Sequence, residues 1–202
     1  LRKHNKVLQI TPNAVDKTSF LTILNLSRGG FFKKNIRTTI VAALDLKSNE
    51  KIYKLLKVLG FLGNEILGAK MKFQTLAEPF KNFGDGPITP LFEEFPSMIA
   101  AISANEEGRK IIFKDPAFRK QFVKEWNHKA ASVFPKALKE MWVVRSPDPT
   151  HAGKNFQQIG EEAGKDPVVH FMDLLAEHDT RLRWQCDTSN HREKIRLELL
   201  SY

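Results

Sequence analysis

The stretch between residues 153 and 200 constrains the fold most, because helix start signals, helix stop signals and hydrophobic spacing agree along it. Asn155 is followed three residues later by glutamine, which is the spacing of a capping box, and Gly164 suits the position just after a helix. Asp166 and Pro167 then provide the N-cap and first residue of a second helix, whose apolar residues recur three and four positions apart. The sequence therefore predicts two consecutive helices here.

A strand and a final helix are expected to follow. Leu182, Trp184 and Cys186 alternate with polar residues, and a period of two is typical of a β-strand. Asn190 then precedes a last helical pattern. None of these residues forms a catalytic constellation, so this stretch predicts an architecture and no reaction.

The first part of the chain predicts strands joined by a helical crossover. Lys6–Ile10 is typical of a short buried strand, and residues 69–74 alternate as a strand does. A helix is expected between Asn49 and Gly68. Residues 18–26 are apolar without a clean period, and residues 38–46 favour strand at their β-branched start and helix at their alanine pair. A strand, a helix and another strand indicate a βαβ unit with a parallel sheet and a right-handed connection.

The pattern changes over residues 78–150, which are rich in proline, glycine and phenylalanine. Helical segments are also expected there, one of them capped by Asp115. We expect the aromatic residues of this stretch to pack over a core, which leaves a ligand-binding role as the alternative. The predicted organisation is an α/β core in residues 1–77, a loop-rich helical insertion in residues 78–150, and a helix-helix-strand-helix return to the core in residues 151–202.

Composition limits the class of protein. With 202 residues, 42% of them hydrophobic, the chain can bury one sizeable core. The net charge of +9 comes from 32 basic and 23 acidic residues that are mostly interspersed, so we expect a solvated basic surface and no nucleic-acid partner. No apolar run is long enough to span a membrane. A single cysteine rules out an internal disulfide and fits a reducing compartment, which favours a cytoplasmic protein.

The histidine and cysteine residues predict no metal site. No two histidines have the four-residue spacing of a zincin helix, and His170 and His178 are eight residues apart. A surface or capping role is expected for both. Cys186 alternates with apolar residues and is expected to be a small buried side chain, although a thiolate ligand or nucleophile is the alternative.

Three glutamines are candidate substrate-binding residues. Gln9, Gln74 and Gln185 fall in predicted strands, and residues near the carboxyl ends of barrel strands face the active site. The alternative is an ordinary hydrogen bond at the end of a strand. Asp187 and His191 follow the third strand, where a loop would enter the mouth of a barrel, and they are weaker candidates by the same argument.

Several segments resemble one enzyme family. The segments are Gly153–Pro167 with the following Asp173, the Asp-Pro-Ala-Phe-Arg run of residues 115–119, and Gly68–Phe80. They resemble the C-terminal half of the N-acyl-D-amino-acid deacylases, or D-aminoacylases, of the metal-dependent amidohydrolase superfamily. The resemblance extends from about Val7 to the C-terminus. It implies an α/β fold that is a partial TIM-like (β/α) barrel, covering roughly the fifth to seventh strand–helix units, with a long helical insertion.

The resemblance also implies an activity, namely hydrolysis of the amide C–N bond of a small N-acyl amino acid by a zinc-activated water. The chain has no His-x-His strand, the strand at residues 7–11 carries no histidine, and Tyr202 falls about where the catalytic aspartate strand would begin. A complete barrel typically needs about 250 residues. We therefore expect part of such an enzyme, inactive alone and without a zinc site of its own, with another chain or a missing segment completing the fold.

A second hypothesis needs no reaction. Because no catalytic motif lies in the chain, it could instead be a non-enzymatic basic α/β or helical module that binds an acidic partner or nucleic acid through lysine and arginine faces. Bound zinc would favour the amidohydrolase. Nucleic-acid binding that weakens steeply with salt would favour the module.

Overall fold

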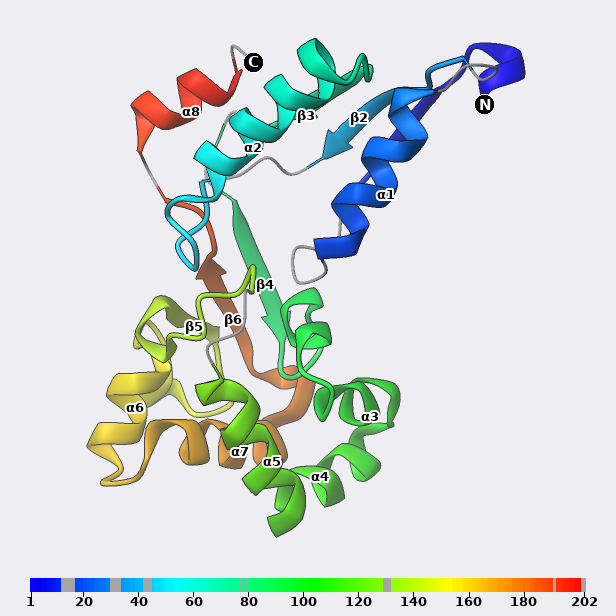
Figure 1. Cartoon of the computed structure of the whole chain (residues 1–202). Helices are drawn as coiled ribbons and strands as arrows, with labels where there is room; N and C mark the ends of the chain where they lie inside the picture. Colours follow the sequence, from blue (N-terminus) through cyan, green and yellow to red (C-terminus); the bar gives the residue numbers. More distant parts are fainter. Residues whose placement is uncertain are drawn as a thin grey trace. The chain divides into compact units, whose positions relative to one another are not determined.

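The computed structural model divides the chain into two compact units (Figure 1). The first contains residues 1–80, 131–133 and 189–202, and the second contains residues 81–130 and 134–188. The structure describes residues 1–11, 17–29, 34–41, 45–76, 78, 80–128, 132–190 and 192–200, with the backbone alone for Arg2, Lys17, Phe20 and Leu200. No helix in these ranges is both long and apolar enough to cross a membrane.

The first unit is built on a three-stranded parallel sheet with the order β1-β2-β3. Its strands are β1 (Val7–Ile10), β2 (Arg37–Val41) and β3 (Met71–Gln74). Its helical elements are η1 (Arg2–His4), α1 (Lys17–Arg28), α2 (Ile52–Phe61), its π-helical continuation η2 (Leu62–Ile66), and α8 (Glu193–Leu200). The predicted βαβ unit is confirmed, and the ambiguous run at residues 38–46 begins as strand β2, while residues 42–44 lie outside the described residues.

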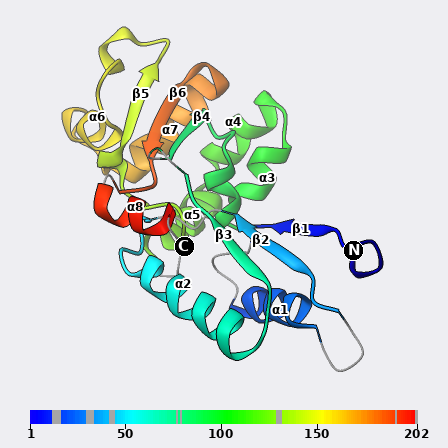
Figure 2. The ribbon, with the colours of Figure 1, turned by 90° about the horizontal axis from the view of Figure 1, so that it is seen from above.

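Both connecting helices pack on the same face of this sheet (Figure 2). From α1, Ile23 packs against Ile40 and Met71, and the hydroxyl of Ser27 is 2.7 Å from that of Thr38. From η2, the absence of a side chain at Gly63 admits the Met71 methyl group, since a Cβ there would collide with it. A Cβ at Gly63 would also lie 3.3 Å from Cδ1 of Leu24 on α1, so the two helical elements meet on one side of the sheet.

The opposite face of the sheet is less covered. Its side chains are exposed or half-buried, in contrast to the buried Thr38, Ile40 and Met71 of the helix-covered face. They alternate with the core residues along the three strands, as the pleat requires. The residues of this open face are Val7, Gln9, Arg37, Thr39, Val41, Lys72 and Gln74.

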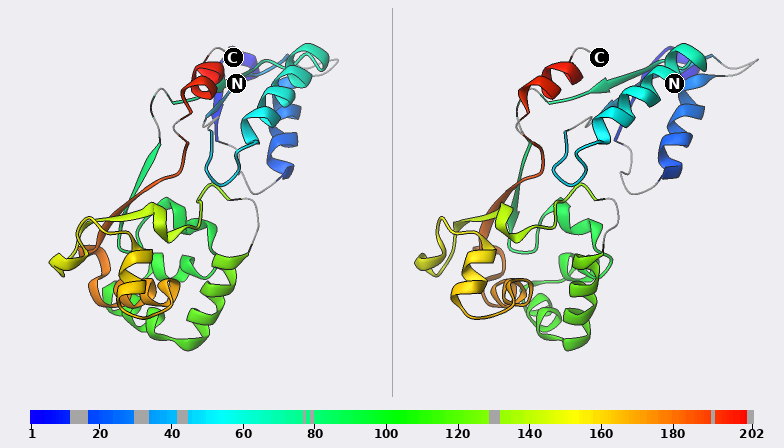
Figure 3. Two further views of the ribbon diagram at one scale, coloured as in Figure 1. Left: turned by 90° about the vertical axis from the view of Figure 1, so that its left-hand side faces the viewer. Right: turned by 60° about the vertical axis from the view of Figure 1, so that its left-hand side comes forward.

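The second unit is built on an antiparallel sheet with the order β4-β6-β5. Its strands are β4 (Lys81–Asp85), β5 (Met141–Arg145) and β6 (Arg183–Asp187). Its α-helices (Figure 3) are α3 (Met98–Ser103), α4 (Glu106–Lys114), α5 (Pro116–Asn127), α6 (Phe156–Glu162) and α7 (Pro167–His178). Helix α4 contacts α3, α5 and α7, and α7 also contacts α5 and α6. Its short 3-10 helices are η3 (Pro90–Glu94), η4 (Leu138–Glu140), η5 (Pro149–His151) and η6 (Asp179–Arg181).

The structure confirms the α/β class and changes the expected organisation. The strand predicted around Trp184 exists as β6, but it pairs antiparallel with β4 and β5 and is therefore not a further strand of the parallel sheet. The expected segment 151–202 is divided, because residues 151–188 fold with residues 81–130 and only residues 189–202 belong to the first unit. No closed barrel is present among the described residues.

Aromatic packing explains why the second unit folds together. Phe92, which comes from the loop-rich stretch, is fully buried and lies 5.5 Å from Trp184 of β6 and 5.9 Å from Phe171 of α7, measured between ring centroids. The indole of Trp184 donates a hydrogen bond to the carbonyl oxygen of Gly86 at 2.8 Å. The expectation that the loop aromatics pack over a core is confirmed for Phe92 and Phe95, whereas Phe83 is 46% exposed.

A buried ion pair joins helix α4 to the end of helix α7. Nε and Nη2 of Arg109 donate to the two carboxylate oxygens of Asp179 at 2.6 and 2.7 Å. The side chains are only 12% and 5% exposed, and hydrogen bonding to Asp179 raises the pKa of the guanidinium. Because burial keeps water away from both side chains, the two parallel hydrogen bonds of this bidentate pair satisfy both charges.

Replacing Arg109 by methionine is expected to destabilise the second unit by about 3–5 kcal/mol, because it leaves the Asp179 carboxylate buried and unpaired. Urea unfolding, monitored by tryptophan fluorescence, measures this loss in the free energy of unfolding. The matched control is Lys154→Met, which removes the exposed pair with Glu162 and should cost less than about 1 kcal/mol. Equal losses in the two variants would contradict the role given to the buried pair.

The helix starts of the second unit follow the predicted caps. Asn155 and Gln158 form the expected capping box, and the Asp166 carboxylate accepts from the backbone N–H groups of Val168 and Val169. Asp115 caps α5 in the same way. The arginine of the Asp-Pro-Ala-Phe-Arg segment, Arg119, donates to Asp173 of α7 at 2.6 Å, so two segments that carry the family resemblance contact each other.

Asp173 makes the stability of the second unit depend on pH. Burial acts to raise its pKa, but hydrogen bonds from Arg119 and Lys165 outweigh it and lower the pKa below 3.8. The contribution of Asp173 to stability is therefore complete above its unfolded-state pKa and is lost as the pH falls through the lower folded-state value.

We expect Asp173→Asn to lower the free energy of unfolding at pH 7 by about 1–2 kcal/mol and to lose its effect as the pH falls toward about 2. Urea unfolding of both proteins at a series of pH values measures this. A difference that stays constant from pH 7 to pH 2 would show that the carboxylate charge contributes nothing.

Candidate functional site

The carboxyl ends of β1, β2 and β3 meet at one edge of the parallel sheet, which is where ligands bind in open α/β folds. Gln9 and Gln74 lie on the open face near this edge, on the two outer strands. Nε2 of Gln9 is 3.5 Å from Oε1 of Gln74, at the outer limit of a hydrogen bond, and both side chains are exposed. The structure therefore brings together two of the three glutamines selected from the sequence.

Gln185 lies in the second unit. It is half-buried on β6, where it is in register with Phe83 on one side and Trp142 on the other. A substrate-binding role for Gln185 requires a parallel strand whose carboxyl end lies at the mouth of a barrel, and the antiparallel strand β6 does not meet that condition. Asp187 is half-buried at the end of the same strand, and His191 lies outside the described residues.

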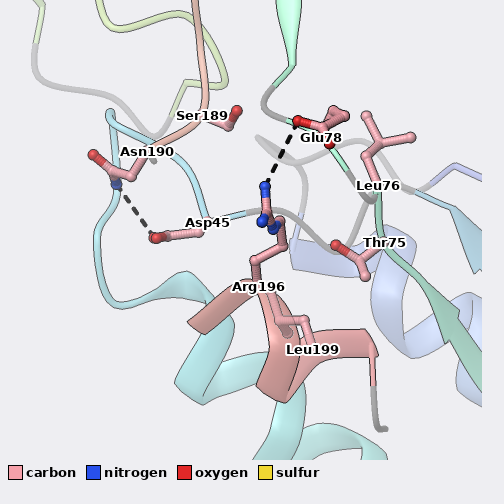
Figure 4. Close-up of a pocket in the computed structure, with 8 residues that line it drawn as sticks. All are labelled: Asp45, Thr75, Leu76, Glu78, Ser189, Asn190, Arg196 and Leu199. Atoms are coloured by element: carbon pink, nitrogen blue, oxygen red, sulfur yellow. Dashed lines mark hydrogen bonds and ion pairs between the residues drawn. The ribbon is translucent and has the colours of Figure 1, made fainter. Parts of the chain in front are cut away.

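A small pocket lies beyond the ends of β2 and β3, next to the C-terminal segment (Figure 4). Its volume is about 20 Å³, enough for about one water molecule. The pocket is lined by Asp45, Thr75, Leu76, Glu78, Ser189, Asn190, Arg196 and Leu199.

Asp45 ties the C-terminal segment to the end of β2. Nε of Arg192 donates to Oδ2 of Asp45 at 2.7 Å, and Nη2 of Arg192 donates to Oδ1. The backbone N–H of Asn190 donates to the Asp45 carbonyl oxygen at 2.7 Å, and the Asn190 amide donates to Oδ1 at 3.2 Å. The hydrogen bond with Asp45 raises the pKa of the Arg192 guanidinium. Asp45 is 6% exposed and both of its carboxylate oxygens are engaged, so its role is structural.

Arg196 is the pocket residue with hydrogen-bonding capacity to spare. Its Nη1 lies 3.7 Å from Oε2 of Glu78, whose side chain is 87% exposed. Its Nε is buried and has no hydrogen-bond partner within the described part of the chain. Figure 4 shows this side chain reaching from α8 toward Glu78. A buried donor left unpaired costs free energy, so a water or a ligand oxygen bound to Nε would stabilise the pocket.

The arrangement is suited to binding a polar group and provides no catalytic pair. The Ser189 hydroxyl already accepts from the backbone N–H of Phe80 at 2.6 Å. Zinc prefers imidazole, thiolate and carboxylate ligands. The strand ends here offer the amides and hydroxyl of Gln9, Gln74 and Thr75, and the nearby carboxylates of Asp45 and Glu78 face Arg192 and Arg196. No group of three potential metal ligands occurs in the parts of the chain that the structure describes. These residues therefore do not fit the zinc site that the resemblance implies.

The other candidates selected from the sequence, Cys186, His170 and His178, all lie in the second unit. Cys186 is fully buried in the core of the second unit, as expected for a small apolar side chain. His170 is half-buried on α7. His178 is 8% exposed, so the surface half of the predicted surface or capping role is wrong for it, although it does lie at a helix end as the last residue of α7. Burial, assisted by the nearby His151, lowers the pKa of His178 and favours the neutral imidazole.

Sequence reasoning missed Asp45, Asn190, Arg192 and Arg196 as members of one site. One signal was present, since Asp45 is the only charged residue in the apolar run 38–46 and follows a strand whose end marks the ligand edge of a parallel sheet. The partners are more than 140 residues away along the chain, and nothing in the sequence pairs them.

Comparison with known proteins gives relatives without an assigned activity. The chain is 29% identical over 197 residues to uncharacterised proteins of Mycobacterium bovis and of two strains of Mycobacterium tuberculosis. The match covers 95% of this chain and 32% of each relative, so the chain spans about a third of the length of the curated relatives it matches. No family profile and no solved structure matches the chain.

Replacing Asp45 by asparagine is expected to release the C-terminal segment from the end of β2, because the charge-assisted bonds to Arg192 are lost. We expect a loss of about 1–3 kcal/mol in the first unit and faster hydrogen exchange at residues 189–200. Hydrogen–deuterium exchange with mass spectrometry measures it. Glu50→Gln removes the exposed partner of Arg192 and is the control, with exchange expected to stay unchanged. Equal exchange in the two variants would contradict the anchoring role of Asp45.

Proposed function

We propose that this chain is part of a metal-dependent amidohydrolase that resembles the N-acyl-D-amino-acid deacylases and hydrolyses the amide bond of a small N-acyl amino acid. The resemblance of residues 153–167, 115–119 and 68–80 supports the proposal. The chain alone is proposed to be inactive, and a cytoplasmic location remains part of the proposal.

One structural observation carries this proposal, namely that three consecutive strands are neighbours in the sheet and both connecting helices lie on one face. Doubly wound folds place helices on both faces of the sheet. In a (β/α) barrel all helices lie outside, and the other face of the sheet lines the interior. We propose that β1, β2 and β3 are consecutive strands of a barrel, with Gln9, Thr39 and Gln74 on its inner face.

The second unit then takes the place of the helical insertion, with corrected bounds. In chain order it lies between β3 and α8, and both of these elements belong to the first unit. An insertion at this point is an enlarged loop from a barrel strand to its helix. Such loops lie at the carboxyl face of the barrel, where the loops differ most from one barrel enzyme to another.

Open edges and apolar surface in the first unit support a larger assembly. Among the described residues, β1 and β3 each pair only with β2, so both outer edges of the sheet have free backbone groups. Leu55, Val58, Phe61 and Ile66 on α2 and η2 are 51–63% exposed. Proteins usually cover such edges and patches. We propose that further segments of a longer protein, as in the relatives of about three times this length, or another chain cover them.

In this proposal the chain positions the substrate, and the metal is held elsewhere. Gln9 and Gln74 are exposed and can hydrogen-bond the amide of an N-acyl amino acid. The pocket at Arg196 has room for about one water molecule and is not assigned to the substrate. Zinc, the metal of the family that the chain resembles, would need ligands outside the described residues. No metal-dependent step is therefore assigned to this chain.

The test is the intact mass, zinc content and activity of the protein purified from the cells that make it. We expect a mass well above 23.1 kDa, about one or two zinc ions per chain, and hydrolysis of N-acetyl-D-methionine but not of its L enantiomer. A mass of 23.1 kDa with no zinc and no hydrolysis would exclude the proposal.

The same preparation tests the alternative, a basic module that binds an acidic partner or nucleic acid, which the net charge of +9 favours. Binding to a DNA duplex that falls steeply between 50 and 200 mM salt, about 1,000-fold for six phosphate contacts, would support that alternative.

A further inference from the structure

A basic pocket lies between helices α4, α5 and α7 and the turn before α7 in the second unit, and it shares no residue with the candidate substrate-binding site. Its volume is about 500 Å³, within the range of about 300–1,000 Å³ that is common for small-molecule sites. The pocket is lined by Lys110, Lys114, Arg119, Lys165, His170, Asp173, Ala176 and Glu177.

One side of the pocket is held rigid by a network around Asp173. Its Oδ1 accepts from Nη2 of Arg119 at 2.6 Å, and its Oδ2 accepts from Nζ of Lys165 at 3.0 Å. Arg119 is fixed a second time, because its Nε donates to the carbonyl oxygen of Phe113 at the end of α4. Nδ1 of His170 lies 3.6 Å from Oδ2 of Asp173. The carboxylate is thus already neutralised by its own partners.

Two lysines of the pocket have no such partner. Lys110 and Lys114 are four residues apart on α4, so they project from the same side of the helix. Neither forms an ion pair or hydrogen bond with another described residue in this structure. Glu177 is the remaining acidic side chain of the lining. Four basic and two acidic groups leave the pocket with a net charge of +2 when His170 is neutral.

We propose that this pocket binds the phosphate group of a small molecule, with Lys110 and Lys114 as the direct contacts and Arg119 as a fixed positive charge behind them. A phosphate monoester carries a charge between about −1.5 and −2 at neutral pH, which matches the charge of the pocket. Lysine ammonium groups act as mobile point charges that suit a phosphate oxygen.

The shape of the lining favours a small ligand over a nucleic acid. Single-stranded nucleic acids need a positively charged groove with aromatic side chains on which bases stack. The pocket is confined to three helices and the turn before α7, and its lining includes no Phe, Tyr or Trp. The site does not depend on the proposed amidohydrolase activity, because it uses only residues of the second unit.

The experiment is an isothermal titration calorimetry measurement in which inorganic phosphate is titrated into the 202-residue chain at constant ionic strength. The test variant is Lys110→Gln with Lys114→Gln. The matched control is Lys120→Gln with Lys124→Gln, which removes the same charge at the same spacing from exposed positions of α5 that do not line the pocket. Because all four lysines are exposed, both variants are expected to fold, and thermal unfolding checks this.

We expect the test variant to weaken phosphate binding at least tenfold and the control to change it less than twofold. Equal weakening in both variants would mean a general charge effect and would overturn the site. No binding by the unmodified chain would also overturn it. Citrate that binds as tightly as phosphate would overturn the assignment to phosphate. Tighter binding of a ten-nucleotide single-stranded DNA, weakened equally by both variants, would support a nucleic-acid surface instead.

Discussion

The first unit depends on the strand order of its parallel sheet, together with the rule that connections between parallel strands are right-handed. Because β1, β2 and β3 follow one another in the sheet, each right-handed crossover returns its helix to the same side. The helix-covered face is closed by Ile23, Ile40 and Met71, and the absence of a side chain at Gly63 lets η2 approach the sheet. The opposite face keeps Gln9, Thr39 and Gln74 accessible. The accessible face of the sheet and the single-sided cover of helices thus have one cause.

The second constraint is the return of the chain after the second unit. Residues 81–130 and 134–188 fold around their own aromatic core and form their own antiparallel sheet. The chain then rejoins the first unit through Asn190 and Arg192, whose side chains hold the buried carboxylate of Asp45. This anchor fixes α8 beside the carboxyl ends of β2 and β3, and it gives Arg196 its position in the pocket. The anchor is structural, and the pocket it creates has room for about one water molecule.

Local features could be predicted from the sequence, and features that depend on distant partners could not. The caps at Asn155, Asp166 and Asp115 are made within three residues, so their side-chain chemistry was sufficient to predict them. The strand at Trp184 was visible from its alternation, but alternation carries no information about its antiparallel partners. The α1 helix was not recognised, because Leu21 and Leu26 are exposed and obscure the helical period. Gln9 and Gln74 were correctly placed near strand ends, and their role in substrate binding stays a prediction.

We propose that the outer edges of the sheet in the first unit are covered in a larger protein. Hydrogen–deuterium exchange at β1 and β3 of the 202-residue chain, compared with the aligned strands of the full-length Mycobacterium tuberculosis relative, tests it most directly. We expect the outward amides of β1 and β3 to exchange quickly in the 202-residue chain and slowly in the longer protein, where neighbouring strands would pair with them. Equally fast exchange in both proteins would contradict the claim.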